Sequence, residues 1–397
     1  MAVEPAGAEA PFVLLSCAVT LDGYLNDSGP ERLELSTPDD RDAVDALRAA
    51  SDAILVGAGT IRADDPSLLV RSPVRRAGRR LAGRSASPMR VVLTRSGVLD
   101  SASLVLSDGL ADTLVYIVQP RDAGVRLPAI VESSETSSGH VKRVFTGRSE
   151  LKALLRDLWK RGAHRVLIEG GEKLTTHILT NGLADLVRVA IRPLVIGRSS
   201  APRLAGKLRV RNALMLELQL VHATSVGGMA VLWYSRGSVG DLRAFAPRTD
   251  CEWLAEAIEL AGRCPRSDGA YSVGAIIVDR SGNRLSDGYS RELDPKVHAE
   301  EAAIRKARHL DLSGACMYTS MEPCSRRLSG RTPCVEHIRS AGIARVVYAM
   351  REPTTFVQCD GTQQLRVAGV ETIQIGELEP YAAAPNQHLV ARHQSGA

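Results

Sequence analysis

The stretch that decides the fold of the second half of the chain runs from residue 297 to residue 334. It contains VHAEE at 297–301, MEPCS at 321–325 and RTPC at 331–334. His298, Cys324 and Cys334 offer one nitrogen and two sulfur donors, a set that binds catalytic zinc while a fourth position stays open for water. Glu300 follows the histidine by two residues and suits proton transfer better than metal binding. The stretch therefore predicts a Zn²⁺ centre with an acid–base carboxylate beside it.

This donor set is typical of the zinc deaminases. In these enzymes the metal activates a water that attacks the carbon bearing an amino group, and a nearby glutamate moves protons. The alternative is a buried histidine with two inert core cysteines. Two Pro-Cys dipeptides ten positions apart, downstream of a His-x-Glu, argue against that alternative. The nine residues between the cysteines, which include GRTP at 330–333, form a longer insert than the usual two.

The first half of the chain reads as a second α/β domain. Residues 12–15 and 53–57 are apolar runs typical of buried parallel strands. The second run leads into a Gly-x-Gly turn, which lacks the third glycine of a Rossmann fingerprint. Residues 164–171 form another strand that ends in Glu-Gly-Gly before an expected helix at 172–179. A diglycine there allows a pyrophosphate to approach the helix N-terminus, although a tight strand-to-helix turn would use the same residues.

Together these motifs resemble the bifunctional deaminase/reductase of riboflavin biosynthesis. The resemblance is carried by the His-Ala-Glu, Glu-Pro-Cys and Gly-Arg-Thr-Pro-Cys motifs in the second half, and by Leu-Asp-Gly, Asp-Asp-Pro and Glu-Gly-Gly in the first. It implies an α/β protein with a dihydrofolate-reductase-like reductase domain at 1–245 and a cytidine-deaminase-like α/β/α domain at 246–397. It also implies hydrolytic deamination of a phosphorylated pyrimidine nucleotide and NADPH-dependent reduction of its ribosyl group. In most bacterial members the deaminase comes first, so the domain order here is reversed.

The resemblance also assigns residues to the reductase site. Those expected near NADPH are Ala18, Thr60, Asp64, Gly170 and Gly171. Those expected near the substrate are Arg48, Leu68, Arg71 and Glu169. The arginines suit a sugar phosphate, because a guanidinium meets two oxygens at once.

Some positions depart from the family pattern. Residues 268–272 replace a Thr-Pro-Asn-Pro whose asparagine faces the base, Arg326 and Arg327 stand where the family has a histidine pair, and Ser16 or Cys17 replaces a lysine. The substrate is therefore less determined than the chemistry. The alternatives are a related enzyme of a secondary pathway that acts on another aminopyrimidine, and a protein in which only one domain is active.

The composition indicates the number of domains and argues against some other classes of protein. A chain of 397 residues is long for one core, which favours two domains. Aromatic residues make up only 4%, which argues against the base-stacking surface of a nucleic-acid-binding protein, although the net charge of +5 leaves that class as a rival. The seven cysteines are irregularly spaced, which predicts a reduced, cytoplasmic protein. Residues 1–11 contain no basic segment, so no signal peptide is expected. No apolar run is long enough to predict a membrane span. Family analogy suggests a possible homodimer.

Four local expectations can be compared with the structure. Thr37-Pro38 is expected to start a helix. The arginine-rich residues 73–88 are expected to form a solvated surface loop or, alternatively, a clamp over a phosphate. Residues 235–247 have the composition of a linker, and no clear element is expected from residue 378 onward.

Overall fold

The computed structural model divides into two compact units. It describes residues 10–27, 29, 33–118, 130–133, 141–146, 151–198, 200–206, 217–236, 249–353 and 360–389. The first unit comprises Met1–Arg71 and Ser87–Ala246, and the second comprises Ser72–Ala86 and Pro247–Ala397. The expected linker lies almost entirely outside the described residues.

The first unit is built on a ten-stranded sheet with the order β5-β6-β4-β3-β2-β7-β1-β8-β10-β9. Its central strands run parallel, whereas β5, β10 and β9 pair antiparallel with their neighbours. The strands are β1 (Phe12–Thr20), β2 (Ala53–Gly57), β3 (Met89–Thr94), β4 (Thr113–Val118), β5 (Ile130–Ser133), β6 (Val141–Thr146), β7 (Arg165–Ile168), β8 (Leu186–Arg192), β9 (Gln219–Val226) and β10 (Met229–Ser235).

Both faces of this sheet are covered. In the described part of the unit the helices are α1 (Pro38–Ala50), α2 (Ala58–Asp64), α4 (Leu104–Ser107), α5 (Leu151–Lys160) and α6 (Glu172–Thr180). Successive side chains of a strand point to opposite faces, so Leu14 packs into one core cluster and Leu15 into another. The first cluster includes Leu47 of α1, and the second includes Leu158 of α5. The α/β class expected from the apolar strands is confirmed.

The expected start of α1 is also confirmed. The Thr37 side chain accepts a hydrogen bond from the Asp40 backbone N–H, and Pro38 occupies the first turn. Asp39 and Asp40 place negative charge at the positive end of the helix dipole.

The second unit has a five-stranded sheet in the order β12-β11-β13-β14-β15. Its strands are β11 (Gly274–Val278), β12 (Arg284–Tyr289), β13 (Cys316–Met321), β14 (Arg345–Met350) and β15 (Glu371–Gln374). Its helices are α3 (Pro73–Leu81), α8 (Asp250–Ala261), α9 (Ala299–Lys306), α10 (Cys334–Ser340), α11 (Gly361–Val367) and α12 (Glu379–Ala383), with the 3-10 turns η1 (Gly376–Leu378) and η2 (Ala384–Asn386). Apolar residues of α8, β11, β13 and β14 share one core.

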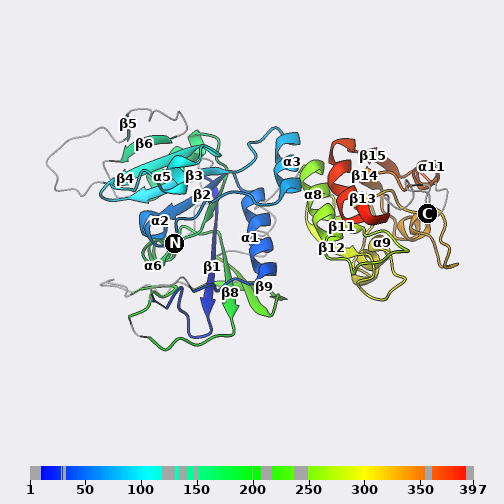
Figure 1. The fold of residues 1–397 in the computed structure, drawn as a ribbon, viewed down its shortest axis with the longest axis horizontal. Helices are drawn as coiled ribbons and strands as arrows, with labels where there is room; N and C mark the ends of the chain where they lie inside the picture. Colours follow the sequence, from blue (N-terminus) through cyan, green and yellow to red (C-terminus); the bar gives the residue numbers. More distant parts are fainter. Residues whose placement is uncertain are drawn as a thin grey trace, which may run out of the picture. The chain divides into compact units, whose positions relative to one another are not determined.

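The expectation of a solvated arginine-rich loop is wrong. Residues 73–81 form α3, which begins with the Ser72 side chain accepting from the Arg75 backbone N–H. This helix lies beside α8 (Figure 1), and its Val74 belongs to the core of the second unit. Arg75 and Arg79 are buried. The arginines therefore serve packing and ion pairing, which their abundance alone did not indicate.

The tail is likewise more ordered than expected, because η1, α12 and η2 follow residue 375. Asn386 is fully buried and exchanges two hydrogen bonds with the Ser272 backbone, at 2.7 and 3.0 Å. The tail thereby fixes the segment that departs from the family pattern.

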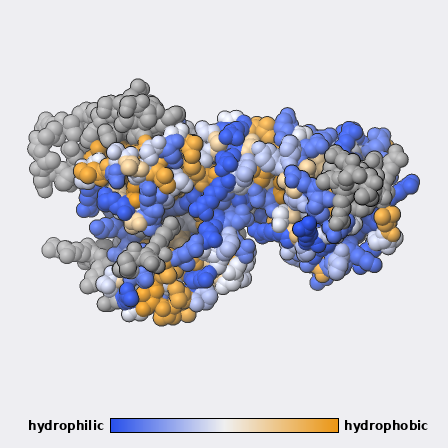
Figure 2. Space-filling view, viewed as in Figure 1, coloured by the Kyte–Doolittle hydropathy of each residue, from blue (hydrophilic) through white to orange (hydrophobic). Residues whose placement is uncertain are grey.

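The surface view gives the distribution of polar and apolar side chains. Figure 2 shows hydrophilic residues over much of the visible face and apolar ones in separate patches. Among the described helices, none combines the length and the apolar character that crossing a bilayer requires.

Candidate active sites

The three predicted metal ligands come from three separate elements of the second unit. His298 is the N-cap residue of α9, Cys324 follows β13, and Cys334 is the first residue of α10. Their ligand atoms all lie within 4.8 Å of one another. Strand β13 pairs with β11 and β14 in the middle of the sheet, so it delivers Cys324 to the edge where α9 and α10 begin.

The spacing of these atoms fits a tetrahedral ion. His298 Nδ1 lies 3.5 Å from the Sγ of Cys324 and 3.5 Å from the Sγ of Cys334. Zinc bonds of about 2.3 Å to sulfur and about 2.05 Å to nitrogen, at a tetrahedral angle, place such a pair about 3.6 Å apart. The donor set and its spacing therefore match a zinc site with three protein ligands.

Glu300 lies beside this cluster. Its side chain is 3% exposed, its Oε2 lies 3.2 Å from Cys334 Sγ, and its Oε1 accepts a hydrogen bond of 3.2 Å from the Thr319 hydroxyl. Burial raises the pKa of Glu300, and the charge on Cys324 adds to the rise. A carboxyl group with a raised pKa is suited to exchange protons near neutral pH.

The surroundings shift the pKa values of the two cysteines in opposite directions. A hydrogen bond from Cys334 and the neighbouring His298 lower the pKa of Cys324, although burial opposes this. Burial raises the pKa of Cys334, and the adjacent Cys324 raises it further. One thiolate is thus formed readily, and a cation between the sulfurs would favour the second.

A cavity of about 310 Å³ opens next to the cluster and is lined by His298, Glu300 and Cys324. Four basic residues also line it: Arg291, Lys296, Arg326 and Arg327. Arg291 donates to the carbonyl oxygens of Pro265 and Tyr271, so its guanidinium holds a loop. Lys296 and Arg326 are exposed.

In the first unit, all nine residues assigned by the resemblance line one cavity of about 790 Å³. They come from β1, α1, α2, the segment after α2 and the turn after β7: Ala18, Arg48, Thr60, Asp64, Leu68, Arg71, Glu169, Gly170 and Gly171. Parallel strands end at this edge of the sheet, which is where open α/β sheets bind ligands.

Two of these residues are already paired with each other. Arg48 donates to Glu169 through Nε to Oε1 and Nη2 to Oε2, both at 2.7 Å, and its Nη1 donates to the Leu69 carbonyl at 3.1 Å. The Arg48 fork thus orients the Glu169 carboxylate rather than facing a phosphate. Leu68, which is 1% exposed, has a φ of 52°, an unusual conformation for a bulky residue that often occurs at ligand sites.

A neighbouring cavity of about 600 Å³ shares Gly59, Thr60 and Gly171 with the first. It is also lined by Arg95 and Lys173, which follow β3 and begin α6. No sequence motif marks these two basic residues, and only their places after a strand and at a helix start could have suggested them.

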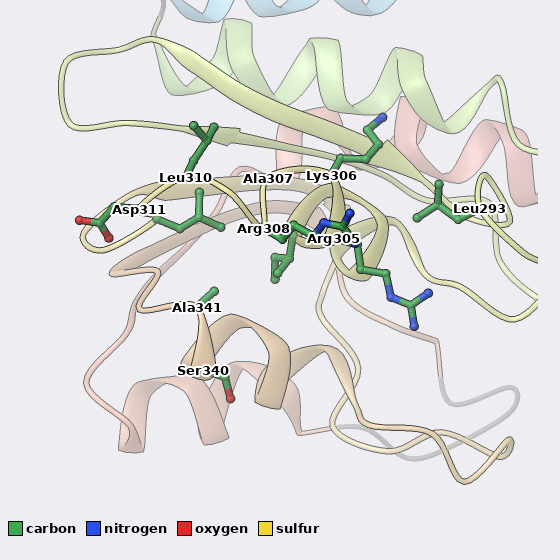
Figure 3. Close-up of a pocket in the computed structure, with 11 residues that line it drawn as sticks. Leu293, Arg305, Lys306, Ala307, Arg308, Leu310, Asp311, Ser340 and Ala341 are labelled. Atoms are coloured by element: carbon green, nitrogen blue, oxygen red, sulfur yellow. The ribbon is translucent and has the colours of Figure 1, made fainter.

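A third cavity, of about 800 Å³, lies in the second unit between α9 and α10, and it contains none of the predicted residues. Figure 3 shows that Arg305 and Lys306 point in different directions there. Lys306 pairs with Asp287 and Glu292 at 2.7 Å, and Arg305 pairs with Glu301 at 2.5 Å. Because these charges are directed to neighbouring carboxylates, we do not assign a site to this cavity.

Comparison with known families follows this division of the chain. Residues 11–232 match the RibD C-terminal domain, and residues 247–350 match the zinc-binding region of cytidine and deoxycytidylate deaminases. The chain belongs to the RibD C-terminal domain family. It also carries a deaminase domain, placed after the reductase domain, so the reversed order implied by the resemblance is confirmed.

Curated relatives match one half of the chain or the other. A 2,5-diamino-6-ribosylamino-4(3H)-pyrimidinone 5′-phosphate reductase of Archaeoglobus fulgidus is 34% identical over 194 residues, which are 48% of this chain and 84% of that protein. A diaminohydroxyphosphoribosylamino-pyrimidine deaminase of Schizosaccharomyces pombe is 35% identical over 164 residues, 40% of each chain. The riboflavin biosynthesis protein RibD of Chlamydia trachomatis is 32% identical over 197 residues, 49% of each chain.

Proposed function

We propose that this RibD-family chain is a bifunctional enzyme of riboflavin biosynthesis, with a reductase domain within residues 1–245 and a zinc-dependent deaminase domain at 246–397 to which Ser72–Ala86 also belongs. The substrate is a phosphorylated diaminopyrimidine that carries a ribosylamino group. The observation that carries the proposal is the convergence of His298, Cys324 and Cys334 beside Glu300 and a cavity, in a chain that also brings nine expected reductase residues around another cavity.

In the deaminase domain, His298, Cys324 and Cys334 would hold the zinc. Zinc at this site would lower the pKa of a water molecule and so supply a nucleophile at neutral pH. The Glu300 carboxylate would hold a proton at this place and pass it to the leaving amino group, so that ammonia departs. Thr319 keeps the carboxylate in place through its hydrogen bond to Oε1.

Recognition of the substrate phosphate in this domain falls to Lys296 and Arg326. Both are exposed and line the cavity, whereas Arg291 and Arg327 are engaged by the protein itself. Arg326 occupies a position where the family has a histidine, so the phosphate contact in this chain carries more positive charge. This interpretation is supported by the distribution of partners among the four basic residues.

In the reductase domain, NADPH would supply a hydride to the ribosylamino carbon. The bond from this carbon to the ring oxygen would break, and the oxygen would take a proton from water, which leaves an open ribityl chain and NADP⁺. Ala18, Thr60, Asp64, Gly170 and Gly171 hold the cofactor, and Arg95 and Lys173 in the adjacent cavity suit its additional phosphate. Arg48 orients Glu169, whose carboxylate accepts hydrogen bonds from the pyrimidine. Arg71 and Leu68 line the substrate side of the cavity.

The order of the two reactions is a separate question. The archaeal relative is named for a pyrimidinone that still carries both amino groups, whereas the fungal relative is named for a deaminase that acts on the ribosylamino compound. Incubation with the diamino substrate, followed by mass spectrometry, would identify the first product by its loss of an amino group or its gain of two hydrogens.

The proposal is tested by measuring ammonia release and NADPH oxidation with the purified chain and the diamino substrate. Metal analysis should find about one zinc per chain. The Cys324→Ser variant should lose zinc and ammonia release but retain NADPH oxidation when the substrate of the reduction step is supplied directly. Turnover of a different aminopyrimidine, with none of this one, would favour the secondary-pathway alternative, and activity of one half alone would contradict the bifunctional assignment.

A further inference from the structure

Arg327 reaches the metal cluster from the loop between Cys324 and Cys334. Its side chain is only 2% exposed, although its neighbours on both sides, Arg326 and Leu328, are exposed. Its Nη2 donates to Cys334 Sγ at 3.3 Å, and its Nη1 donates to Glu301 Oε2 at 2.6 Å. A cation buried this completely is directed to particular partners rather than to solvent.

Glu301 anchors the guanidinium. This carboxylate is 3% exposed and lies in the first turn of α9, next to Glu300 and three residues after His298. It pairs with Arg327 on one side and with Arg305 on the other. Arg327 therefore connects α9, which supplies one metal ligand, to the first residue of α10, which supplies another.

The charges around Cys334 explain why a cation is needed there. Its sulfur lies 3.2 Å from the Glu300 carboxylate and 3.5 Å from the imidazole that it shares with Cys324. As zinc ligands both sulfurs would be thiolates, and two thiolates and a carboxylate in a buried space repel one another. A hydrogen bond from a guanidinium to the sulfur offsets this repulsion and fixes the direction in which the sulfur points.

We propose that Arg327 is a positioning residue of the metal centre, which holds the Cys334 sulfur in the geometry that binds zinc. The inference rests on the proposed function in one respect, namely that zinc binds at His298, Cys324 and Cys334. The resemblance gives a histidine pair at this place, so the arrangement distinguishes this chain from the usual pattern. Hydrogen-bonding partners of metal ligands typically change metal affinity by about 10- to 100-fold when removed.

The test compares zinc retention in Arg327→Met and Arg327→Lys with that in Arg326→Met. Arg326 is a matched control because it adjoins Arg327 and lines the same cavity but is exposed. Zinc affinity is measured by competition with a chromogenic chelator. We expect Arg327→Met to lose about 10- to 100-fold in affinity, Arg327→Lys to lose less, and Arg326→Met to match the wild type.

The spectrum of the Co²⁺-substituted protein gives a second readout that a general loss of stability would not reproduce. Removal of Arg327 should shift the sulfur-to-cobalt charge-transfer band, because the N–H···S hydrogen bond changes the electron density on the thiolate. In Arg327→Met, Glu301 loses a buried partner, which is a structural cost of its own. The Glu301→Gln/Arg327→Met double variant removes that imbalance and should still bind zinc weakly.

The possible failures can be told apart. If the wild-type chain binds no zinc, the proposed deaminase function fails together with this inference. If the wild type binds zinc, and both Arg327→Met and the double variant retain its affinity and cobalt spectrum, only the role of Arg327 is refuted. Should Arg327→Met not fold, Glu301→Gln alone removes the anchor of the guanidinium; a smaller loss of zinc affinity supports the inference, and an unchanged affinity overturns it.

Discussion

Replacement of Arg75 by methionine should destabilise the second unit, because α3 contributes a buried ion pair to it. Arg75 donates to Glu256 of α8 through Nε at 3.0 Å and Nη2 at 3.1 Å, and the two side chains are 3% and 9% exposed. Removing one partner of a buried ion pair costs about 3–5 kcal/mol. We expect about 3 kcal/mol, the lower end of this range, since the Glu256 side chain is 9% exposed. For a unit of this size the melting temperature should fall by about 6–12 °C.

Because α3 packs on α8, the loss of stability in Arg75→Met should be confined to the second unit. A Cβ on Gly78 would lie 2.9 Å from the Cys251 carbonyl oxygen, so the two helices approach closely. Arg84 pairs with Glu252, and the Ser72 hydroxyl bonds Glu259, which adds two further links along α8. A deaminase domain cut out at residue 247 would lose all of these contacts.

Trp253 provides the assay, because it lies on α8 and is 6% exposed. The other two tryptophans, Trp159 and Trp233, belong to the first unit and can be replaced by phenylalanine. Urea unfolding is then followed by the fluorescence of Trp253 alone. The control is the Arg80→Met variant, since Arg80 lies on the same helix but is exposed.

The double variant Arg75→Met/Glu256→Met should recover most of the loss, because a buried apolar pair of similar volume often replaces an ion pair without a net cost. Equal unfolding midpoints for Arg75→Met and Arg80→Met would refute the reasoning and would mean that α3 is not part of the folded second unit.

Three further predictions concern the sites and the stability. Glu300→Gln should lower ammonia release by about 10²–10⁴-fold with unchanged zinc content by metal analysis; loss of zinc would instead make this carboxylate a ligand. Glu169→Gln should weaken its charge-assisted bonds with Arg48 and reduce kcat/KM for NADPH oxidation by about 10- to 100-fold. Ammonia release should stay unchanged when the substrate of the deamination step is supplied directly, and an unaltered kcat/KM would exclude Glu169 from the substrate site. Hydrogen bonds from Arg345 and Tyr318 lower the pKa of Asp250, although burial opposes them. The ionised carboxylate therefore stabilises the fold at pH values above its unfolded pKa of about 3.9. This stabilisation is lost as the pH falls through the lower pKa of the folded state. Urea unfolding of Asp250→Asn should therefore depend less on pH below about 4 than that of the wild type, and equal dependence would contradict the assignment.

Local rules predicted the elements that carry their own signals. The cap at Thr37, the strand that becomes β2 and the helix after Gly171 all follow from capping residues, apolar runs and glycines within a few positions. Helix α3 could not be predicted in this way. Its stability depends on contacts with residues of α8 that are more than 170 positions away in the sequence. Local sequence rules cannot distinguish an arginine-rich segment that is solvated from one whose arginines form ion pairs.

The candidate sites, too, could be predicted only in part, because some of their contacts join residues that are far apart in the sequence. The convergence of His298, Cys324 and Cys334 could be predicted from the sequence, because few side chains bind zinc and this combination of donors is specific. The nine reductase residues were placed by resemblance, and their convergence on one cavity depends on the parallel order of β1, β2 and β7, which local patterns do not determine. The pairing of Arg48 with Glu169 was not foreseen, because each was considered as a ligand contact on its own.

The departures from the family pattern acquire a physical meaning in the structure. Ser272 is held through its backbone by Asn386 and through its hydroxyl by Arg291, so the wall of the deaminase cavity is fixed by groups behind it. Side chains of this segment that face the cavity can therefore be substituted without displacing its backbone. Arg327, by contrast, donates to the sulfur of Cys334, a candidate zinc ligand, and lies between α9 and α10. Substitutions of cavity-facing side chains in residues 268–272 should therefore change which pyrimidine is bound. A substitution of Arg327 should instead change the affinity for zinc. Variants of the first kind should alter the KM for the substrate, and variants of the second kind should alter zinc affinity.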